Sequence, residues 1–198
     1  MNGASRGPTA RVRERALARL AARHPWIYKS DVERLERASG GDVVTVRDAR
    51  GRFLAKALLS DRSEIALRVV SWDDVAIDDA FWARAFDEAL MFRAAVAPGV
   101  RSLRLVHGEA DGFPGLVVDR FADVVSIQTL TQGADRLVPL WLELIQSRLA
   151  PRSIIQRNDS RVRALEGLPE SAGVLAGAEP GRTSHGRARS GAGFAAHP

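Results

Sequence analysis

The chain has 198 residues, of which 45% are hydrophobic and 27% are charged, and its formal net charge is +5. This composition is typical of a globular protein with one large or two small cores, and we expect two small domains. No window is apolar for long enough to span a bilayer, and the N-terminus lacks the apolar stretch of a secretion signal. We therefore expect a cytoplasmic protein with no membrane partner.

Two residue counts restrict the chemistry. The sequence contains no cysteine, which excludes disulfides, thiolate metal sites and a cysteine nucleophile within these residues. Only Lys29 and Lys56 are lysines, so the positive charge is almost wholly arginine. Arginine binds phosphate oxygens and stacks on bases, which favours nucleic-acid binding. An arginine-rich genome that uses arginine wherever lysine would serve explains the composition equally well.

The first third of the chain predicts a small, mostly antiparallel sheet. Two apolar runs, Val43 to Val46 and Phe53 to Leu59, flank the turn residues of "RDARGR", and this arrangement is typical of a hairpin. A third run alternates through Ile65, Leu67 and Val69. Short strands of this kind usually close into a barrel-like module.

The hydrophobic period then changes to three and four residues. The spacing of Trp82, Phe86 and Ala89 predicts a helix, with Asp78 as its N-cap and Pro98-Gly99 at its end. Short β-rich runs follow, then a second helical pattern and the strand-like "RSIIQR". This order predicts a β-β-helix-β unit.

The second helical pattern also predicts a core. Pro139 falls in the first turn of this helix, where its missing N–H is tolerated. We expect apolar side chains of the helix to pack on one face of the sheet. The predicted contacts join Leu137, Trp141, Leu144 and Ile145 of the helix to Leu105, Val117 and Ile127 of the strands.

Three polar segments are candidate functional motifs. "GEADGFPGLVVD" (108–119) contains three acids but lacks the regular oxygen ligands of a calcium loop, so a tight turn between strands is favoured over a metal or catalytic site. "RHPWIYK" (23–29) mixes cations with aromatics, as single-stranded nucleic-acid surfaces do, although a core tryptophan is the alternative. "QRNDSRVRALEGL" (156–168) alternates charges, which is typical of a solvated, internally paired surface.

These segments occur in an order that resembles a known family. Together with "GDVVTVRDARGRFLAKALLS" and "SEIALRVVSW", they are similar to the front half of the class I S-adenosylmethionine-dependent methyltransferases that modify cytosine-5 of 23S ribosomal RNA, over roughly residues 12–177. In that family, a PUA domain that binds RNA precedes a central domain and then a Rossmann-like methyltransferase domain. The resemblance implies a PUA-like barrel in the first unit.

The resemblance also implies residue roles. The RNA-binding candidates are Arg23, His24, Trp26, Lys29, Arg157, Arg161 and Arg163. A structural motif of the central domain matches Gly108, Asp111, Gly112, Pro114, Gly115 and Asp119. The expected partner is large-subunit ribosomal RNA, and a homodimer is compatible with the sequence.

The family's cofactor loop and cysteine nucleophile have no counterpart here, so we expect no catalytic, cofactor-binding or metal residue in this chain. S-adenosylmethionine would serve only the full-length family. We expect a truncated or frameshifted front end that recognises RNA without methylating it. An inert folded fragment and a stand-alone RNA-binding or interaction module are the alternatives, and whether the chain is an enzyme stays open.

The expected fold class is α+β, with a PUA-like barrel, a β-β-helix-β central domain and no Rossmann-like domain. The expected divisions are a flexible leader (1–11), the PUA-like domain (12–75), a connector helix (77–96), the central domain (99–176) and a disordered tail (177–198).

Overall fold

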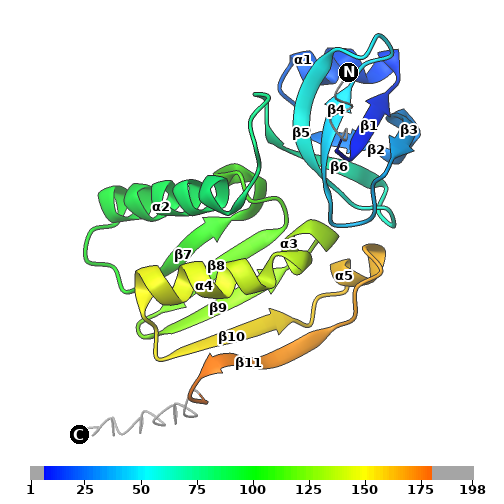
Figure 1. Ribbon diagram of the computed structural model, residues 1–198. Coiled ribbons are helices and arrows are strands. Elements are labelled where there is room, and N and C mark those ends of the chain that lie inside the picture. Colours follow the sequence, from blue (N-terminus) through cyan, green and yellow to red (C-terminus); the bar gives the residue numbers. More distant parts are fainter. Residues whose placement is uncertain (1–6, 180–198) are drawn as a thin grey trace, which may run out of the picture.

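The computed structural model describes residues 7–179, which form two sheets joined by a long helix (Figure 1). The first sheet has the strand order β2-β6-β5-β4-β1-β3. Its strands are β1 (Thr9–Val12), β2 (Trp26–Tyr28), β3 (Val32–Glu36), β4 (Val43–Arg47), β5 (Phe53–Leu59) and β6 (Ile65–Ser71). The short helix α1 (Leu17–Ala21) lies between β1 and β2.

The predicted hairpin is confirmed, because β4 and β5 pair antiparallel from Val43↔Leu58 to Arg47↔Phe53. The turn depends on Asp48, whose carboxylate accepts hydrogen bonds from the backbone N–H groups of Arg50 and Arg52 at 2.9 and 2.8 Å. An aspartate that binds backbone N–H groups two and four residues later stabilises a tight turn. The turn therefore holds its two arginines in fixed positions on the backbone.

Helix α2 (Asp79–Val96) connects the two sheets. The predicted N-cap is confirmed, since the Asp78 carboxylate accepts a hydrogen bond from the backbone N–H of Phe81 at 2.8 Å. Trp82, Phe86 and Ala89 are buried, as their spacing predicts. This face packs into the core of the second sheet.

The second sheet has the order β11-β10-β9-β8-β7, and α2 and α4 lie over one of its faces (Figure 1). Its strands are β7 (Ser102–His107), β8 (Leu116–Phe121), β9 (Val124–Thr129), β10 (Ser153–Asn158) and β11 (Ser171–Gly177). Three helices accompany them, namely α3 (Gln132–Arg136), α4 (Val138–Leu149) and α5 (Val162–Leu165). Pro139 lies in the first turn of α4, as predicted.

The predicted fold class is wrong for this second unit. In place of β-β-helix-β, the chain forms an antiparallel meander of β7, β8 and β9, followed by α3 and α4 and then β10, which pairs parallel to β9. The helices thus form a crossover between two parallel strands, which is the βαβ connection of α/β sheets. Strand β11 then pairs antiparallel to β10. Its sequence "SAGVLAG" has weak strand propensity, so its position depends on pairing with β10.

One predicted core contact is also wrong. Leu105, Ile127, Trp141, Leu144 and Ile145 share the second core with partly buried Leu137, as expected, but Val117 is not part of it. Its neighbours Leu116 and Val118 belong to this core instead. Successive side chains of a strand point to opposite faces, so the side chain of Val117 lies on the face of the sheet away from the helices.

Parts of two predicted segments lie outside the described residues. These are residues 1–6 of the expected leader and residues 180–198 of the expected tail. Within residues 7–179, β1 begins at Thr9 and β11 ends at Gly177. No helix in this range is both long and apolar enough to cross a membrane.

Candidate nucleic-acid interface

The three polar segments of the sequence meet where the two sheets adjoin. Trp26 of β2 donates its indole N–H to the Glu109 carboxylate at 3.1 Å. Arg68 of β6 donates to Glu166 at 2.9 Å, and its Nε lies 3.6 Å from Glu109. We call these four side chains the junction, because each bond links the first sheet to the second unit.

The junction is largely shielded from water. The side chains of Arg68 and Glu166 are 9% and 1% exposed. A buried ion pair is stable only when hydrogen bonds satisfy the remaining polar atoms, and Arg68 also donates to the Ser60 hydroxyl at 3.0 Å. Leu58 of β5 reaches into the core of the second unit, where a Cβ on Gly133 would lie 2.8 Å from its methyl groups. The two units are therefore closely packed.

The segment 108–119 forms the connection between β7 and β8. The Asp111 carboxylate accepts hydrogen bonds from the backbone N–H of His107 at 2.7 Å and from Arg93 at 2.5 Å. Gly115 has a φ of +78°, and a Cβ there would lie 2.3 Å from Thr131. Only glycine adopts this positive φ without strain and leaves room for the Thr131 side chain.

The other residues of this motif have local partners as well. The Pro114 carbonyl accepts a hydrogen bond from the Thr131 hydroxyl at 3.1 Å, and Asp119 forms a two-bond pair with Arg104 at 2.8 and 3.0 Å. Gly108 and Gly112 adopt φ values of 55° and 79°. These hydrogen bonds and backbone conformations support the geometry of the connection between β7 and β8.

Arg163 lies at the carboxyl ends of the parallel strands β9 and β10. Its guanidinium donates to the Thr129 carbonyl and hydroxyl and to Asp135, the last at 2.8 Å. Asn158 donates to the same Thr129 hydroxyl at 2.9 Å. In open α/β sheets, ligands bind at the carboxyl ends of the strands. Here the protein's own side chains fill that position.

A groove on the first unit combines aromatic and cationic side chains. The Arg23 guanidinium lies over the Trp72 ring, 5.0 Å from its centroid. Arg52 and Phe53 line the same hollow, whose volume is about 490 Å³, together with Leu17, Leu20, Ala21 and Leu54. We call it the α1 groove. Aromatic faces stack on bases and guanidinium groups bind phosphates, so the α1 groove has the components of a single-stranded nucleic-acid site.

The backbone of Arg23 is strained. Its φ is +59°, in the left-handed region that side chains with a Cβ rarely adopt. This residue follows the end of α1, where glycine is the usual choice. Strain of this kind often marks a functional position, and here it accompanies the contact of Arg23 with Trp72.

The structure separates the other RNA-binding candidates. The Nδ1 atom of His24 accepts a hydrogen bond from the backbone N–H of Trp26 at 3.2 Å, whereas Lys29 is exposed. Arg157 pairs with Asp159 at 3.2 Å on the surface of the second unit, and Arg161 is exposed nearby in the sequence. "RHPWIYK" thus contributes Arg23 to the α1 groove and Trp26 to the junction.

A hydrogen bond with Arg157 lowers the pKa of Asp159, so this pair is charged at neutral pH. Across residues 7–179, no three His, Cys, Asp or Glu side chains are grouped so as to hold a metal ion.

Sequence comparison shows a PUA-like domain in the first unit. Residues 10–72 match the model of this family, which confirms the predicted PUA-like module. This range includes all six strands of the first sheet except the beginning of β1. The α1 groove therefore lies on a PUA-like domain.

The chain is also similar to curated methyltransferases. It is 37% identical over 175 residues to "Ribosomal RNA large subunit methyltransferase I" of Yersinia pseudotuberculosis serotype O:1b (strain IP 31758) and of Yersinia pestis bv. Antiqua (strain Angola). Each match covers 86% of this chain and 43% of the relative. The chain thus spans less than half the length of these relatives.

Solved structures share the fold. A chain from Streptococcus mutans described as a SAM-dependent methyltransferase superposes with a TM-score of 0.72 and 16% identity, covering 87% of this chain and 44% of that one. A chain described as a methyltransferase and solved with SAH gives 0.73, also at 16% identity, with coverages of 87% and 43%. These likenesses correct the prediction of no Rossmann-like domain, because almost the whole chain, including the five-stranded sheet and its parallel crossover, has the fold of methyltransferase chains.

The shared fold does not assign a methyl-donor site to these residues, since fold and site vary independently. The position at which an α/β sheet binds its ligand is occupied by Arg163, which is 2% exposed. We therefore assign no described residue to S-adenosylmethionine.

Sequence reasoning missed Trp72, Arg52 and Arg68. Trp72 directly follows an alternating strand, and Arg52 lies in a turn, so neither has a distinctive spacing. Arg68 interrupts an apolar run, and a charged residue inside a buried strand is a signal that could have pointed to the junction.

Proposed function

We propose that this chain binds large-subunit ribosomal RNA through the α1 groove of its PUA-like domain and contributes RNA recognition to a methyltransferase function. The single observation that carries the proposal is the Arg23 guanidinium stacked over Trp72 in an open hollow. Within residues 7–179, the Arg23 side chain has no acidic partner, so its charge is available to a phosphate. The names of the Yersinia relatives support ribosomal RNA as the partner.

Two mechanisms act together in this groove. A base that stacks on an aromatic ring contributes about 1–3 kcal/mol regardless of its identity. A guanidinium that neutralises a phosphate releases a counterion, which makes the affinity dependent on salt. The proposed site therefore favours single-stranded RNA, whose bases are free to stack.

We further propose that these residues do not transfer a methyl group by themselves. The cytosine-5 chemistry that the resemblance implies uses a thiolate that adds to the base, and the sequence contains no cysteine. Incubation with labelled methyl donor and unmodified ribosomal RNA tests this directly. Incorporation above background would contradict it.

The RNA proposal is tested with Arg23→Gln and Trp72→Leu. Binding to a fragment of large-subunit ribosomal RNA is measured over a salt series, with Arg84→Gln on the exposed face of α2 as the matched control. We expect Trp72→Leu to lose about 1–3 kcal/mol of binding free energy. Arg23→Gln should reduce the slope of log affinity against log salt by about 0.7, and the control should do neither.

Thermal unfolding of each variant separates binding from folding. If the wild-type chain binds no RNA, or binds it independently of salt, the chain is an inert or protein-binding module and the proposal is wrong. If both variants bind RNA as tightly as the control does, RNA is recognised elsewhere on the surface.

A further inference from the structure

A row of arginines crosses the outer face of the first sheet. In the register of the strands, Arg11 of β1 lies opposite Arg34 of β3 on one side and Arg47 of β4 on the other. Adjacent strands are about 4.8 Å apart, so three positive side chains stand side by side. The alternation of β1 confirms the face, since its neighbours Ala10 and Val12 are fully buried.

Like charges directly opposite each other in a sheet are unfavourable. Nearby acids neutralise only part of the row, since Glu36 pairs with Arg34 at 3.2 Å, and Asp74, which pairs with Lys56 at 2.7 Å, also interacts electrostatically with Arg47. Arg47 donates one hydrogen bond to the Gly51 carbonyl at 2.9 Å. In the part of the chain that the structure describes, the Arg11 guanidinium has neither a hydrogen bond nor an acidic partner.

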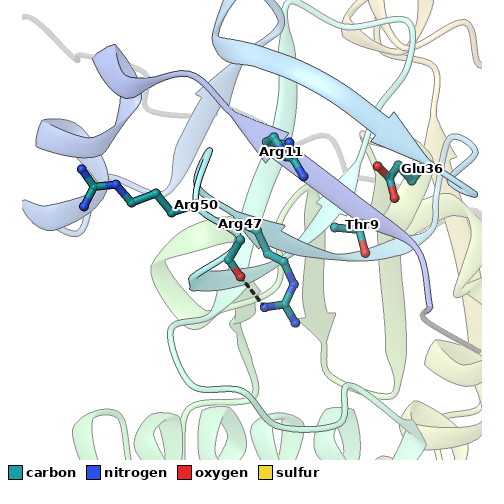
Figure 2. Close-up of a pocket in the computed structure, with 6 residues that line it drawn as sticks. Thr9, Arg11, Glu36, Arg47 and Arg50 are labelled. Atoms are coloured by element: carbon teal, nitrogen blue, oxygen red, sulfur yellow. Dashed lines mark hydrogen bonds between the residues drawn. The ribbon is translucent and has the colours of Figure 1, made fainter. Parts of the chain in front are cut away.

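The row borders a hollow of about 400 Å³ (Figure 2). Its lining residues are Thr9, Arg11, Glu36, Arg47, Arg50 and Gly51. In Figure 2, the Arg50 side chain points away from Glu36. The Arg50 guanidinium also has no partner among residues 7–179, although the backbone of Arg50 is held by Asp48.

The hollow is connected to the α1 groove. A third hollow shares Arg50 with the first hollow and shares Arg52 and Leu17 with the α1 groove. The turn "RDARGR" therefore carries cations from the outer face of the sheet round to the stacking groove. Arg52 is paired with Asp48 at 2.6 Å, whereas Arg11, Arg47 and Arg50 offer separate cationic positions, which suit a chain of phosphates better than a single small anion.

We propose that Arg11, Arg47 and Arg50 form a second, phosphate-binding site, occupied by the backbone of the RNA strand whose bases enter the α1 groove. The anion compensates the positive charge of Arg11 and Arg50, whose guanidinium groups have no acidic partner among the described residues. This site rests on the proposed RNA function for its natural occupant, whereas its phosphate chemistry is independent of it. Phosphate contacts position RNA without reading its sequence, so the site contributes affinity and not base specificity.

The test uses the full chain and the variants Arg11→Gln, Arg47→Gln and Arg50→Gln, singly and combined, with Arg84→Gln as the control. Affinity for mixed-sequence single-stranded RNA is measured over a salt series. Each substitution should reduce the slope of log affinity against log salt by about 0.7, so the triple variant loses about 2. Because these side chains lie outside the core, the variants should unfold at or above the wild-type temperature.

A second arm uses inorganic phosphate alone. Phosphate should raise the melting temperature of the wild-type chain above that in chloride of equal ionic strength, and the triple variant should not respond.

If the wild-type chain binds RNA and the triple variant keeps its salt slope, the second site is wrong while the α1 groove stands. If the wild-type chain binds no RNA but phosphate stabilises it through these arginines, the site is supported for a free phosphate and the RNA function fails. If the wild-type chain binds no RNA and phosphate does not raise its melting temperature, both proposals fail.

Discussion

The junction and the outer face of the first sheet use arginine in opposite ways. At the junction, Arg68 is buried against Glu166, and in the second unit Arg163 is buried against Asp135. On the outer face, the guanidinium groups of Arg11 and Arg50 have no partner among the described residues. Burial of a charge without a counter-charge costs several kcal/mol, whereas exposed like charges repel one another only weakly through water. Paired arginines therefore maintain the fold, and unpaired ones are available to a ligand.

This difference bears on the question that composition left open, namely whether the arginines reflect nucleic-acid binding or an arginine-rich genome. An arginine-rich genome would distribute arginines without regard to acidic partners. Arg15, which precedes α1, and Arg19 of α1 both bind the buried Asp31, so these two also have a structural explanation. Among residues 7–179, Arg11 and Arg50 lie on β1 and on the β4–β5 turn without an acidic partner, as do Arg84 of α2 and Arg161 elsewhere on the surface. Part of the positive charge is thus used in ion pairs within the protein, and the unpaired part is available to a ligand.

The largest expected effect comes from a substitution that breaks the junction. Glu166→Ala leaves Arg68 buried without its closest carboxylate, and we expect a loss of about 3–5 kcal/mol in the free energy of unfolding. Urea denaturation measures it. The double variant Arg68→Met with Glu166→Leu should recover most of the loss, because an apolar pair replaces the ion pair. A loss below about 1 kcal/mol for Glu166→Ala would place this pair in the same class as exposed ones.

A smaller effect is expected at Trp26, and it tests whether this residue belongs to the junction or to the RNA surface. Trp26→Phe keeps an aromatic ring but removes the N–H that Glu109 accepts. We expect a loss of about 1 kcal/mol in the free energy of unfolding with RNA affinity unchanged. The comparison with Arg23→Gln is informative, since that variant should lose RNA affinity and keep stability. Lost RNA affinity with unchanged stability for Trp26→Phe would move Trp26 to the RNA surface.

The smallest effect concerns the turn that presents the cations. Burial raises the pKa of Asp48, but hydrogen bonds from the Arg52 side chain and from the backbone of Arg52 and Arg50 outweigh it, so the pKa lies below the ordinary 3.8. A lowered pKa in the folded state stabilises the fold above 3.8 and loses this contribution as the pH falls below that value.

Melting temperature as a function of pH measures this contribution, with Asp48→Asn as the control. The variant should melt at a lower temperature than the wild-type chain at neutral pH, and the two should converge in acid. Parallel curves at all pH values would show that the Asp48 charge does not stabilise the turn.

The sequence by itself determined the local features. The β4–β5 hairpin, the Asp78 cap of α2 and Pro139 in the first turn of α4 each depend on residues within a few positions of one another. Such features follow from backbone geometry and short-range hydrogen bonds. A barrel-like module was predictable for a related reason, because a regular succession of short strands limits the architectures available, whereas its PUA-like character was implied by the family resemblance.

Only the tertiary structure decided where the functional side chains meet. Trp26 and Glu109 are 83 positions apart, and Arg68 and Glu166 are 98 apart. The arginine row depends on the parallel pairing of β1 with β4 and on the antiparallel pairing of β1 with β3. No short turn connects either pair of strands, so the local sequence does not predict the pairing. Local propensity and hydrophobic period describe one element at a time. Which elements become neighbours is set by the packing of the two cores, and that packing placed partners beside some arginines and left others without one.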